Sequence, residues 1–282
     1  MYFFLTGGTG FVGSQFIRHA LIKSHNIKAI KRSEKSDVKI ILKDKPSWVI
    51  KKFSELQIND FINCEVLVHM AAHSANFPYD TLENCIKFNV TETLNLFNVA
   101  YSAGIRKFVI TGSCFEYGKK GEEYKFIPPD ASLFPTQTYP TSKAMASILM
   151  TQWALQRKVS LKILRLFQIY GEGELKTRLW PTLREKALKG ENLKMTYGEQ
   201  IRDFIKVDDV SKIILEESIN MEENRISIKN IGSGNPKKLK DFVFETWKKL
   251  NAKGKIELGS IPYRDNEIMR FVPNIDLEYV VK

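Results

Sequence analysis

Near its N-terminus the chain reads Thr-Gly-Gly-Thr-Gly-Phe-Val-Gly over residues 6–13. An apolar run at residues 2–5 has the length of a buried strand, and residues 16–22 follow with helical spacing. Glycines spaced in this way, between a strand and a helix, let the backbone turn tightly and approach a pyrophosphate, which the helix N-terminus stabilises. Such turns also join strands and helices that bind nothing, but here the required context is met. The stretch therefore predicts a dinucleotide site at Gly7, Gly10, Phe11, Val12 and Gly13.

Apolar runs and helical patterns alternate along the rest of the chain. Strands are expected at residues 27–30, 48–50, 65–71 and 107–111, and helices at 82–103, 138–157, 181–189, 209–219 and 239–250. This alternation predicts an α/β fold with a Rossmann-type, doubly wound parallel sheet covered on both faces. We expect residues 1–166, with parts of 200–235, to form the dinucleotide-binding domain. Residues 167–282 are expected to form a smaller, discontinuous substrate-binding lobe.

The composition limits the classes of protein to which this chain can belong. The chain of 282 residues has 43% hydrophobic residues, enough for an enzyme-sized core, and a formal net charge of +11. Lysine and arginine are spread out with no long basic block, so we expect no nucleic-acid partner, although the charge can attract an anionic substrate. No apolar run reaches transmembrane length, and a strand beginning at residue 2 leaves no room for a signal peptide. A soluble, cytoplasmic protein without a membrane partner is expected.

Cysteine and histidine spacing bears on metal binding. The three cysteines, at positions 64, 85 and 114, lack the spacing of a metal site or of a redox Cys-x-x-Cys pair, which fits a reducing compartment. His69 and His73 lie four residues apart, but at the end of an expected strand rather than on a helix face. We therefore expect no bound metal ion.

The second expected strand ends in Ile30-Lys31-Arg32-Ser33, and this ending bears on the choice of cofactor. An acidic residue here would bind the 2′-hydroxyl of an adenosine ribose, whereas two basic residues and a serine suit a 2′-phosphate. Lys31, Arg32 and Ser33 therefore favour NADP(H). NAD(H) is the alternative if the basic pair belongs to the general excess of lysine.

A second informative stretch, Tyr139-Pro140-Thr141-Ser142-Lys143, lies at the start of the helix expected at 138–157. Residues four apart share a helix face, so the ammonium group of Lys143 can favour the Tyr139 phenolate and lower a pKa that is ordinarily about 10. A pair of this spacing also occurs on ordinary exposed helices. Ser113, at the end of the strand expected at 107–111, favours a catalytic site, because its hydroxyl can hydrogen-bond a substrate carbonyl oxygen.

Jointly these stretches resemble the extended short-chain dehydrogenase/reductase family, and within it the nucleotide-sugar epimerases, dehydratases and ketoreductases. The resemblance runs from residue 2 to about residue 275. It rests on motifs in the family's order at residues 6–13, 68–72, 89–95, 111–118, 139–143, 164–171 and 198–210. Such an ordered set is hard to obtain by chance.

The resemblance implies roles for individual residues. Tyr139 would be the general acid/base, Lys143 would bind the nicotinamide ribose and tune Tyr139, and Ser113 would orient the reacting sugar oxygen. It also implies that Asn89 orders the central helix. Ala71 and Ala72 would line the cofactor site.

The implied substrate contacts include departures from the family pattern. Family members usually have asparagine where this chain has Gln168, and another asparagine near Arg178; both normally touch the nucleotide diphosphate. Arg178, Arg202 and Arg264 would each supply a charge-assisted contact to a phosphate, with a solvated or structural arginine as the alternative. Cys114, directly after Ser113, completes the expected substrate contacts.

The chain lacks residues that some reactions of the family require, and this reduces the number of reactions that the resemblance implies. Sugar-nucleotide 4,6-dehydratases have an Asp-Glu pair after the catalytic hydroxyl, where this chain has Cys114 and Phe115, so dehydration is disfavoured. The cysteine and histidine that GDP-fucose synthases use for epimerisation at C3 and C5 are not matched either. A 4-ketoreductase and a 4-epimerase remain. A non-catalytic NADP-binding sensor tends to lose the acid/base pair that this chain retains, and is the third alternative.

The choice between the two enzymes depends on the cofactor. An epimerase recycles tightly held NAD, whereas a reductase exchanges its cofactor at every turnover and commonly uses NADPH. The basic ending at residues 31–33 and the Gly-Ser-Cys-Phe-Glu-Tyr-Gly form at 112–118 favour the reductase. The expected reaction is reduction at C4 of an NDP-4-keto-6-deoxyhexose, dTDP- or CDP-linked, in deoxysugar biosynthesis for surface polysaccharide.

The helices expected at 82–103 and 138–157 bear on assembly. Both are amphipathic, and in the family such helices commonly pair across a twofold axis, so a homodimer is expected. Helices buried inside one subunit would have the same pattern.

Overall fold

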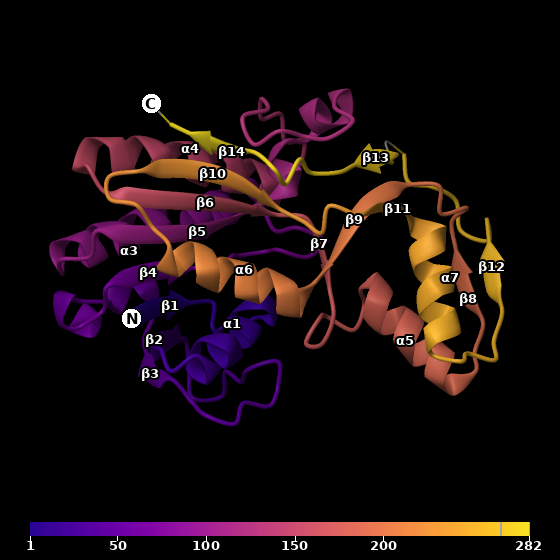
Figure 1. The fold of residues 1–282 in the computed structure, drawn as a ribbon, viewed down its shortest axis with the longest axis horizontal. Coiled ribbons are helices and arrows are strands. Elements are labelled where there is room, and N and C mark those ends of the chain that lie inside the picture. Colours follow the sequence, from indigo (N-terminus) through magenta and orange to yellow (C-terminus); the bar gives the residue numbers. More distant parts are fainter. Residues whose placement is uncertain (266, 282) are drawn as a thin grey trace.

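The computed structural model describes residues 1–265 and 267–281. Its larger part is built on an eight-stranded sheet in the order β14-β10-β6-β5-β4-β1-β2-β3 (Figure 1), parallel except for the antiparallel pair β14 and β10. The strands are β1 (Tyr2–Thr6), β2 (Asn26–Lys31), β3 (Ser47–Ile50), β4 (Val66–His69), β5 (Lys107–Ser113), β6 (Ser160–Leu166), β10 (Ile226–Ile231) and β14 (Glu278–Val280). The strand order reverses between β1 and β4, as at the switch point of a doubly wound α/β sheet. The expected fold class is confirmed.

Helices cover both faces of this sheet, because side chains alternate between the faces along each strand. Phe3 and Leu5 of β1 pack on one face with α1 (Phe11–Ile22) and α6 (Val207–Ile219). Phe4, between them, points to the opposite face, which α3 (Glu92–Ser102) and α4 (Thr138–Arg157) cover. One short strand thus contributes to both apolar layers.

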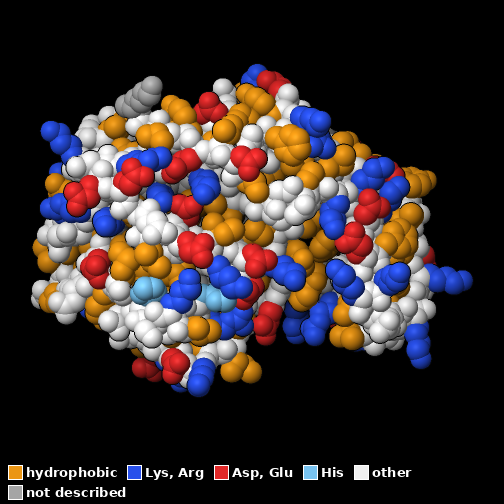
Figure 2. Space-filling view, in the orientation of Figure 1, with side chains coloured by type: hydrophobic (Ala, Val, Ile, Leu, Met, Phe, Trp, Pro, Cys, Tyr) orange, Lys and Arg blue, Asp and Glu red, His pale blue; other side chains and the backbone are white. Residues whose placement is uncertain are grey.

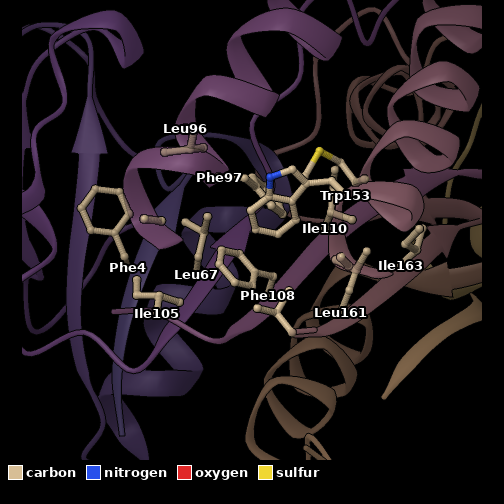
Figure 3. Close-up of a cluster of buried hydrophobic side chains, with 14 of the residues drawn as sticks. Phe4, Leu67, Leu96, Phe97, Ile105, Phe108, Ile110, Trp153, Leu161 and Ile163 are labelled. Atoms are coloured by element: carbon tan, nitrogen blue, oxygen red, sulfur yellow. The ribbon is translucent and has the colours of Figure 1, made fainter. Parts of the chain in front are cut away.

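Aromatic side chains anchor α4 to β5 in the second layer (Figure 3). Phe97 of α3 stacks on Phe108 of β5 with 5.0 Å between ring centroids, and Trp153 of α4 meets both rings edge-on. The indole of Trp153 also donates a hydrogen bond to Asn98 Oδ1 at 2.9 Å. This packing fixes the strand that ends in Ser113 relative to the helix that begins beside Tyr139.

The helix expected at 82–103 is interrupted. It consists of α2 (Leu82–Ile86), a π-helical turn at Lys87–Thr91 and α3. The strand expected at 65–71 ends at His69. A hydrophobic pattern does not specify a π turn, and such turns are frequent at functional sites.

The strands β6, β10 and β14 of the large sheet were not among the expected strands. In β6 the charged residues Lys162 and Arg165 interrupt the apolar run, yet both are buried. Lys162 is paired with Glu217 and Arg165 with Glu116, so the interior of the sheet accommodates their charges. The pattern concealed this strand because the partners that allow its burial lie far away in sequence.

A smaller lobe lies beside the large sheet (Figure 1). It contains a sheet of β7 (Gln168–Tyr170), β9 (Ile201–Lys206), β11 (Pro236–Lys238) and β13 (Arg270–Phe271), and a pair of β8 (Leu193–Met195) and β12 (Ile256–Leu258). Helices α5 (Leu179–Lys189) and α7 (Leu239–Lys249) pack together over a separate apolar cluster that includes Leu183 and Phe242. The division into two domains stays a prediction.

Charged side chains of both signs are visible on one face of the molecule. On the face in Figure 2, side chains of Lys and Arg are mixed with those of Asp and Glu. Within residues 1–265 and 267–281, no helix combines the length and the apolar character needed to cross a membrane.

Candidate active site

The glycine turn joins the end of β1 to the start of α1, and its backbone closes on itself through a hydrogen bond from Gly10 N to Gly7 O at 2.9 Å. A Cβ atom on Gly13 would lie 2.1 Å from Gly7 O, and one on Gly7 would lie 2.6 Å from the carbonyl carbon of Met70. Gly7 also has a φ of +75°, which favours glycine. The uncharged first turn of α1, which includes Phe11 and Gly13, leaves its N–H groups for an anion. These residues fit a dinucleotide pyrophosphate.

His69 supports this turn from β4. Thr6 Oγ1 lies 2.8 Å from His69 Nδ1 and 3.3 Å from the backbone nitrogen of Ala71, while Thr93 Oγ1 lies 3.2 Å from His69 Nε2. Burial lowers the pKa of His69 to about 3, so the ring is neutral and joins β1, β4 and α3. In the described part of the chain, no group of three or more His, Cys, Asp or Glu side chains is arranged to hold a metal ion.

The basic ending of β2 has other contacts in this structure. Lys31 Nζ donates to the carbonyl oxygen of Glu34 at 3.1 Å and lies 5.5 Å from the centroid of the Trp48 ring. Arg32 and Ser33 are exposed beyond the strand. The predicted preference for NADP(H) therefore depends on Arg32 and Ser33 more than on Lys31.

Asn89 sits in the π turn and ties three segments together. Its Oδ1 accepts from the backbone N–H of His73 at 2.7 Å, and its amide donates to His73 O at 3.1 Å and to Ser142 Oγ at 2.9 Å. Ser142 Oγ in turn donates to Tyr139 O at 2.8 Å. Asn89 thus fixes the first turn of α4 through Ser142, a residue to which the sequence analysis assigned no role.

Ser113, Tyr139 and Lys143 lie together in the interior. They are 7%, 8% and 3% exposed, with Ser113 at the end of β5 and the other two on α4. The side chain of Ser113 interacts with the phenol of Tyr139, and Ser113 Oγ accepts from Phe115 N at 3.3 Å. A hydroxyl and a phenol are thus paired, and the buried Lys143 lies one helical turn further along α4.

The acid/base balance differs from the expected one. Burial raises the pKa of Tyr139 above its usual value, and Glu116, Tyr79 and Cys114 add to the rise. Burial lowers the pKa of Lys143. The expected lowering of the Tyr139 pKa by Lys143 is therefore not seen: the hydrogen bond with Ser113 is the contribution that opposes the rise, and burial outweighs it. Tyr139 is held as the neutral phenol, which is the form that donates a proton.

Tyr79 is a neighbour of the candidate site that the sequence analysis missed. Its ring lies 5.4 Å from that of Tyr139 between centroids, at an interplanar angle of 35°, and Phe77 meets it edge-on. Burial raises the pKa of Tyr79, whereas the positive charges of Arg178 and Arg264 lower it. Tyr79 therefore packs on Tyr139 and lies within the electrostatic reach of Arg178 and Arg264. Its loop belongs to no motif, so no sequence signal identified it.

The candidate substrate residues are brought together in part. Burial raises the pKa of Cys114 to about 12, and the charges of Arg202 and Arg178 act against this rise, so both guanidinium groups are close to Cys114. Arg264 acts on Tyr79 in the same region. Gln168 lies in β7, where it pairs with β9 in the sheet of the lobe, and its contact with a diphosphate stays a prediction.

Two of these arginines already have carboxylate partners. Arg202 forms an ion pair with Glu267 at 3.1 Å and is largely buried, and Arg178 Nε lies 3.6 Å from Glu174 Oε1. An anionic ligand at either guanidinium would therefore compete with that carboxylate. The sequence did not indicate this competition.

Related proteins span most of this chain. A CDP-abequose synthase of Salmonella muenchen is 28% identical over 94% of this chain and 86% of its own length. A CDP-abequose synthase of Salmonella typhimurium is 27% identical over 97% of this chain and 89% of its own length. A probable UDP-arabinose 4-epimerase 3 of Oryza sativa is 25% identical over 90% of this chain and 70% of its own length.

Solved structures share the fold. A UDP-glucose 4-epimerase of Thermotoga maritima superposes with a TM-score of 0.84 at 20% identity, covering 98% of this chain and 90% of the other. The model of the NAD dependent epimerase/dehydratase family matches residues 3–232. This match covers most of the sequence and includes the glycine turn, Ser113 and the Tyr139 to Lys143 pair. The resemblance seen in the sequence is confirmed, and the chain belongs to the NAD dependent epimerase/dehydratase family.

Proposed function

We propose that this protein is an NAD(P)-dependent 4-ketoreductase. Its substrate is an NDP-4-keto-6-deoxyhexose, and it acts in deoxysugar biosynthesis for surface polysaccharide. Between the two expected carriers, dTDP and CDP, the likeness to two CDP-abequose synthases favours CDP. The proposal places the enzyme in the cytoplasm, with NADP(H) as the preferred cofactor.

The neutral Tyr139 beside Ser113 is the observation that carries this proposal. Ketone reduction needs a proton donor at the carbonyl oxygen, and burial keeps the Tyr139 phenol protonated. Elimination of water needs an acid and a base on the neighbouring carbons, which Cys114 and Phe115 do not supply. The site therefore supports reduction better than dehydration.

In the proposed reaction this chain's residues handle the oxygen of the substrate. When bound, the reduced nicotinamide supplies the hydride that C4 receives. Ser113 Oγ donates a hydrogen bond to the C4 oxygen, and the phenol of Tyr139 donates the proton that completes the alcohol. The Lys143 ammonium stabilises the phenolate that is left, and Arg178 and Arg202 bind the diphosphate.

We also propose that the protein is a homodimer. Met145, Ile148 and Leu155 form one stripe along α4, and each is exposed, Ile148 at 63%. A second copy would cover this stripe through the same helix about a twofold axis. Size-exclusion chromatography with light scattering tests this, and a monomer with Ile148→Lys but a dimer in the wild type is the expected result.

The decisive test mixes the purified protein with NADPH, or separately NADH, and a panel of CDP-, dTDP- and GDP-linked 4-keto-6-deoxy sugars. Oxidation of NADPH with one nucleotide sugar, and formation of the matching alcohol, is the expected result. Interconversion of 4-epimers without net oxidation would replace the reductase by the 4-epimerase, which the likeness to a UDP-arabinose 4-epimerase keeps as the second candidate. Cofactor binding without either reaction would favour the sensor.

A further inference from the structure

Glu116 lies directly behind Ser113 and has no exposed surface. It ends the short turn Cys114–Glu116 that follows β5. Its Oε1 accepts a hydrogen bond from Ser113 N at 2.7 Å, and its Oε2 accepts from Ser147 Oγ at 2.8 Å and from Arg165 Nε at 2.9 Å. One carboxylate therefore joins the end of β5 to α4 and to β6.

Gly112 provides the room for this carboxylate. A Cβ atom on Gly112 would lie 2.6 Å from Glu116 Oε1 and 2.9 Å from Arg165 Cγ. Gly112 lies within β5, so the close approach of these side chains accounts for the glycine. Glycine at 112 and glutamate at 116 belong to one packing arrangement.

Arg165 neutralises the carboxylate inside the protein. It is 3% exposed, and its Nη1 donates to Tyr117 Oη at 2.9 Å and to Pro129 O at 2.8 Å. The guanidinium also lies over the Tyr117 ring at 4.7 Å. Buried ion pairs contribute little net stability, but one with so many partners allows a single geometry. The pair with Glu116 therefore holds residues 113–117 in one conformation.

The charge of Glu116 reaches the proposed catalytic groups. After burial, it is the largest contribution to the raised pKa of Tyr139, to which Tyr79 and Cys114 also add. The same charge opposes the fall that burial causes in the pKa of Lys143. Both effects favour a protonated tyrosine beside an ammonium group.

We propose that Glu116 is a positioning residue that sets where the Ser113 hydroxyl meets the reacting oxygen of the substrate. It acts through Ser113 N, and Arg165 keeps it in place. This role rests on the proposed function, because the reacting oxygen is the one that Ser113 binds in that reaction.

The test replaces the ion pair as a unit. Glu116→Leu combined with Arg165→Met substitutes apolar side chains and leaves no buried charge unpaired. Ser147→Ala is the matched control, because it removes a hydrogen bond from the same carboxylate on the side away from Ser113. Hydrogen–deuterium exchange of residues 112–118, kcat, KM, NADPH affinity and melting temperature are measured for each variant.

For the double variant we expect faster exchange at residues 112–118 and a kcat lowered about ten- to hundredfold, since small misplacements of reacting groups are costly. KM and NADPH affinity should be nearly unchanged, and Ser147→Ala should remain close to the wild type. Unchanged exchange in a folded double variant would overturn the proposal. Faster exchange with a wild-type kcat would do so as well.

Glu116→Gln combined with Arg165→Met separates the charge from the hydrogen bond without leaving an unpaired buried guanidinium, and it serves if the Glu116→Leu, Arg165→Met variant does not fold. Glutamine keeps an acceptor for Ser113 N but removes the negative charge, so the pKa of Tyr139 should fall. Because reduction needs protonated Tyr139, the alkaline decline of kcat should begin at a lower pH. An unmoved profile would assign Glu116 a structural role. If the wild type reduces none of the sugars, the proposed function fails, whereas the exchange data still decide whether Glu116 holds Ser113.

Discussion

The candidate residues are held in place differently at the carboxyl ends of the strands of the large sheet and in the smaller lobe. At the strand ends of the large sheet, the close contact of Gly13 with Gly7 and the hydrogen bonds of Asn89 hold the candidate site in place without a ligand. In the lobe, the guanidinium groups of Arg178 and Arg202 are paired with carboxylates, for which an anionic ligand would have to compete. Under the proposed function, the reacting groups would therefore be held by fixed packing, whereas binding of the substrate would depend on ion pairs that a ligand can displace.

Loss of the Tyr139 hydroxyl, at the strand ends of the large sheet, should change kcat most. Tyr139→Phe removes the proposed proton donor and keeps the ring that packs beside Tyr79, so kcat should fall about 10²- to 10⁴-fold. NADPH affinity, measured by fluorescence titration, should be nearly unchanged. Tyr79→Phe is the control, because it removes a neighbouring hydroxyl and should leave most of kcat. Turnover that survives Tyr139→Phe would show that another group donates the proton.

Two glycine variants test whether the backbone frame itself forms the cofactor site. In Gly13→Ala the new Cβ would lie 2.1 Å from Gly7 O, so the turn must shift. Overpacking of this kind costs about 1–3 kcal/mol of stability, and NADPH affinity should fall as well. In Gly10→Ala the corresponding distance is 3.1 Å and the φ of −82° suits alanine, so the effect should be smaller. Equal losses in calorimetry and titration would argue against a turn fixed by close packing.

Local sequence patterns could be predicted from the sequence, whereas contacts made only by tertiary packing could not. The glycine turn and the Tyr139 to Lys143 pair are local patterns whose chemistry requires fixed spacing, and Ser113 ends a recognisable strand. Tyr79 could not be predicted, because tertiary packing alone brings its loop against Tyr139. The direction of the Tyr139 pKa was also missed, since helical spacing accounts for Lys143 but not for burial or for Glu116.

Two variants test whether a substrate phosphate can displace the carboxylate partner of Arg202 in the lobe. If Arg202 binds the diphosphate, Glu267→Gln removes the competing carboxylate charge, although Arg202 still donates to the carbonyl oxygens of Ile201 and Ile268, and should lower KM for the nucleotide sugar severalfold. Arg202→Ala should raise KM about tenfold or more, because hydrogen bonds to charged groups contribute about 1.5–3 kcal/mol. In both variants kcat should change little. A lower melting temperature with unchanged KM in both would mean that the pair with Glu267 is structural.

A change at the end of β2 should have a weaker effect than the others. This segment also lies at the strand ends of the large sheet, but its side chains are exposed. Arg32→Ala should raise KM for NADPH a few fold and leave KM for NADH unchanged, because a single exposed charge is worth about 0–1 kcal/mol in water. Lys35→Ala, an exposed neighbour beyond the strand, is the control for a general loss of positive charge. If both variants weaken NADPH and NADH alike, the positive field attracts any anionic dinucleotide and Arg32 does not read the 2′-phosphate. If Arg32→Ala affects NADPH alone, one exposed side chain sets the cofactor preference of a site whose backbone accepts both cofactors.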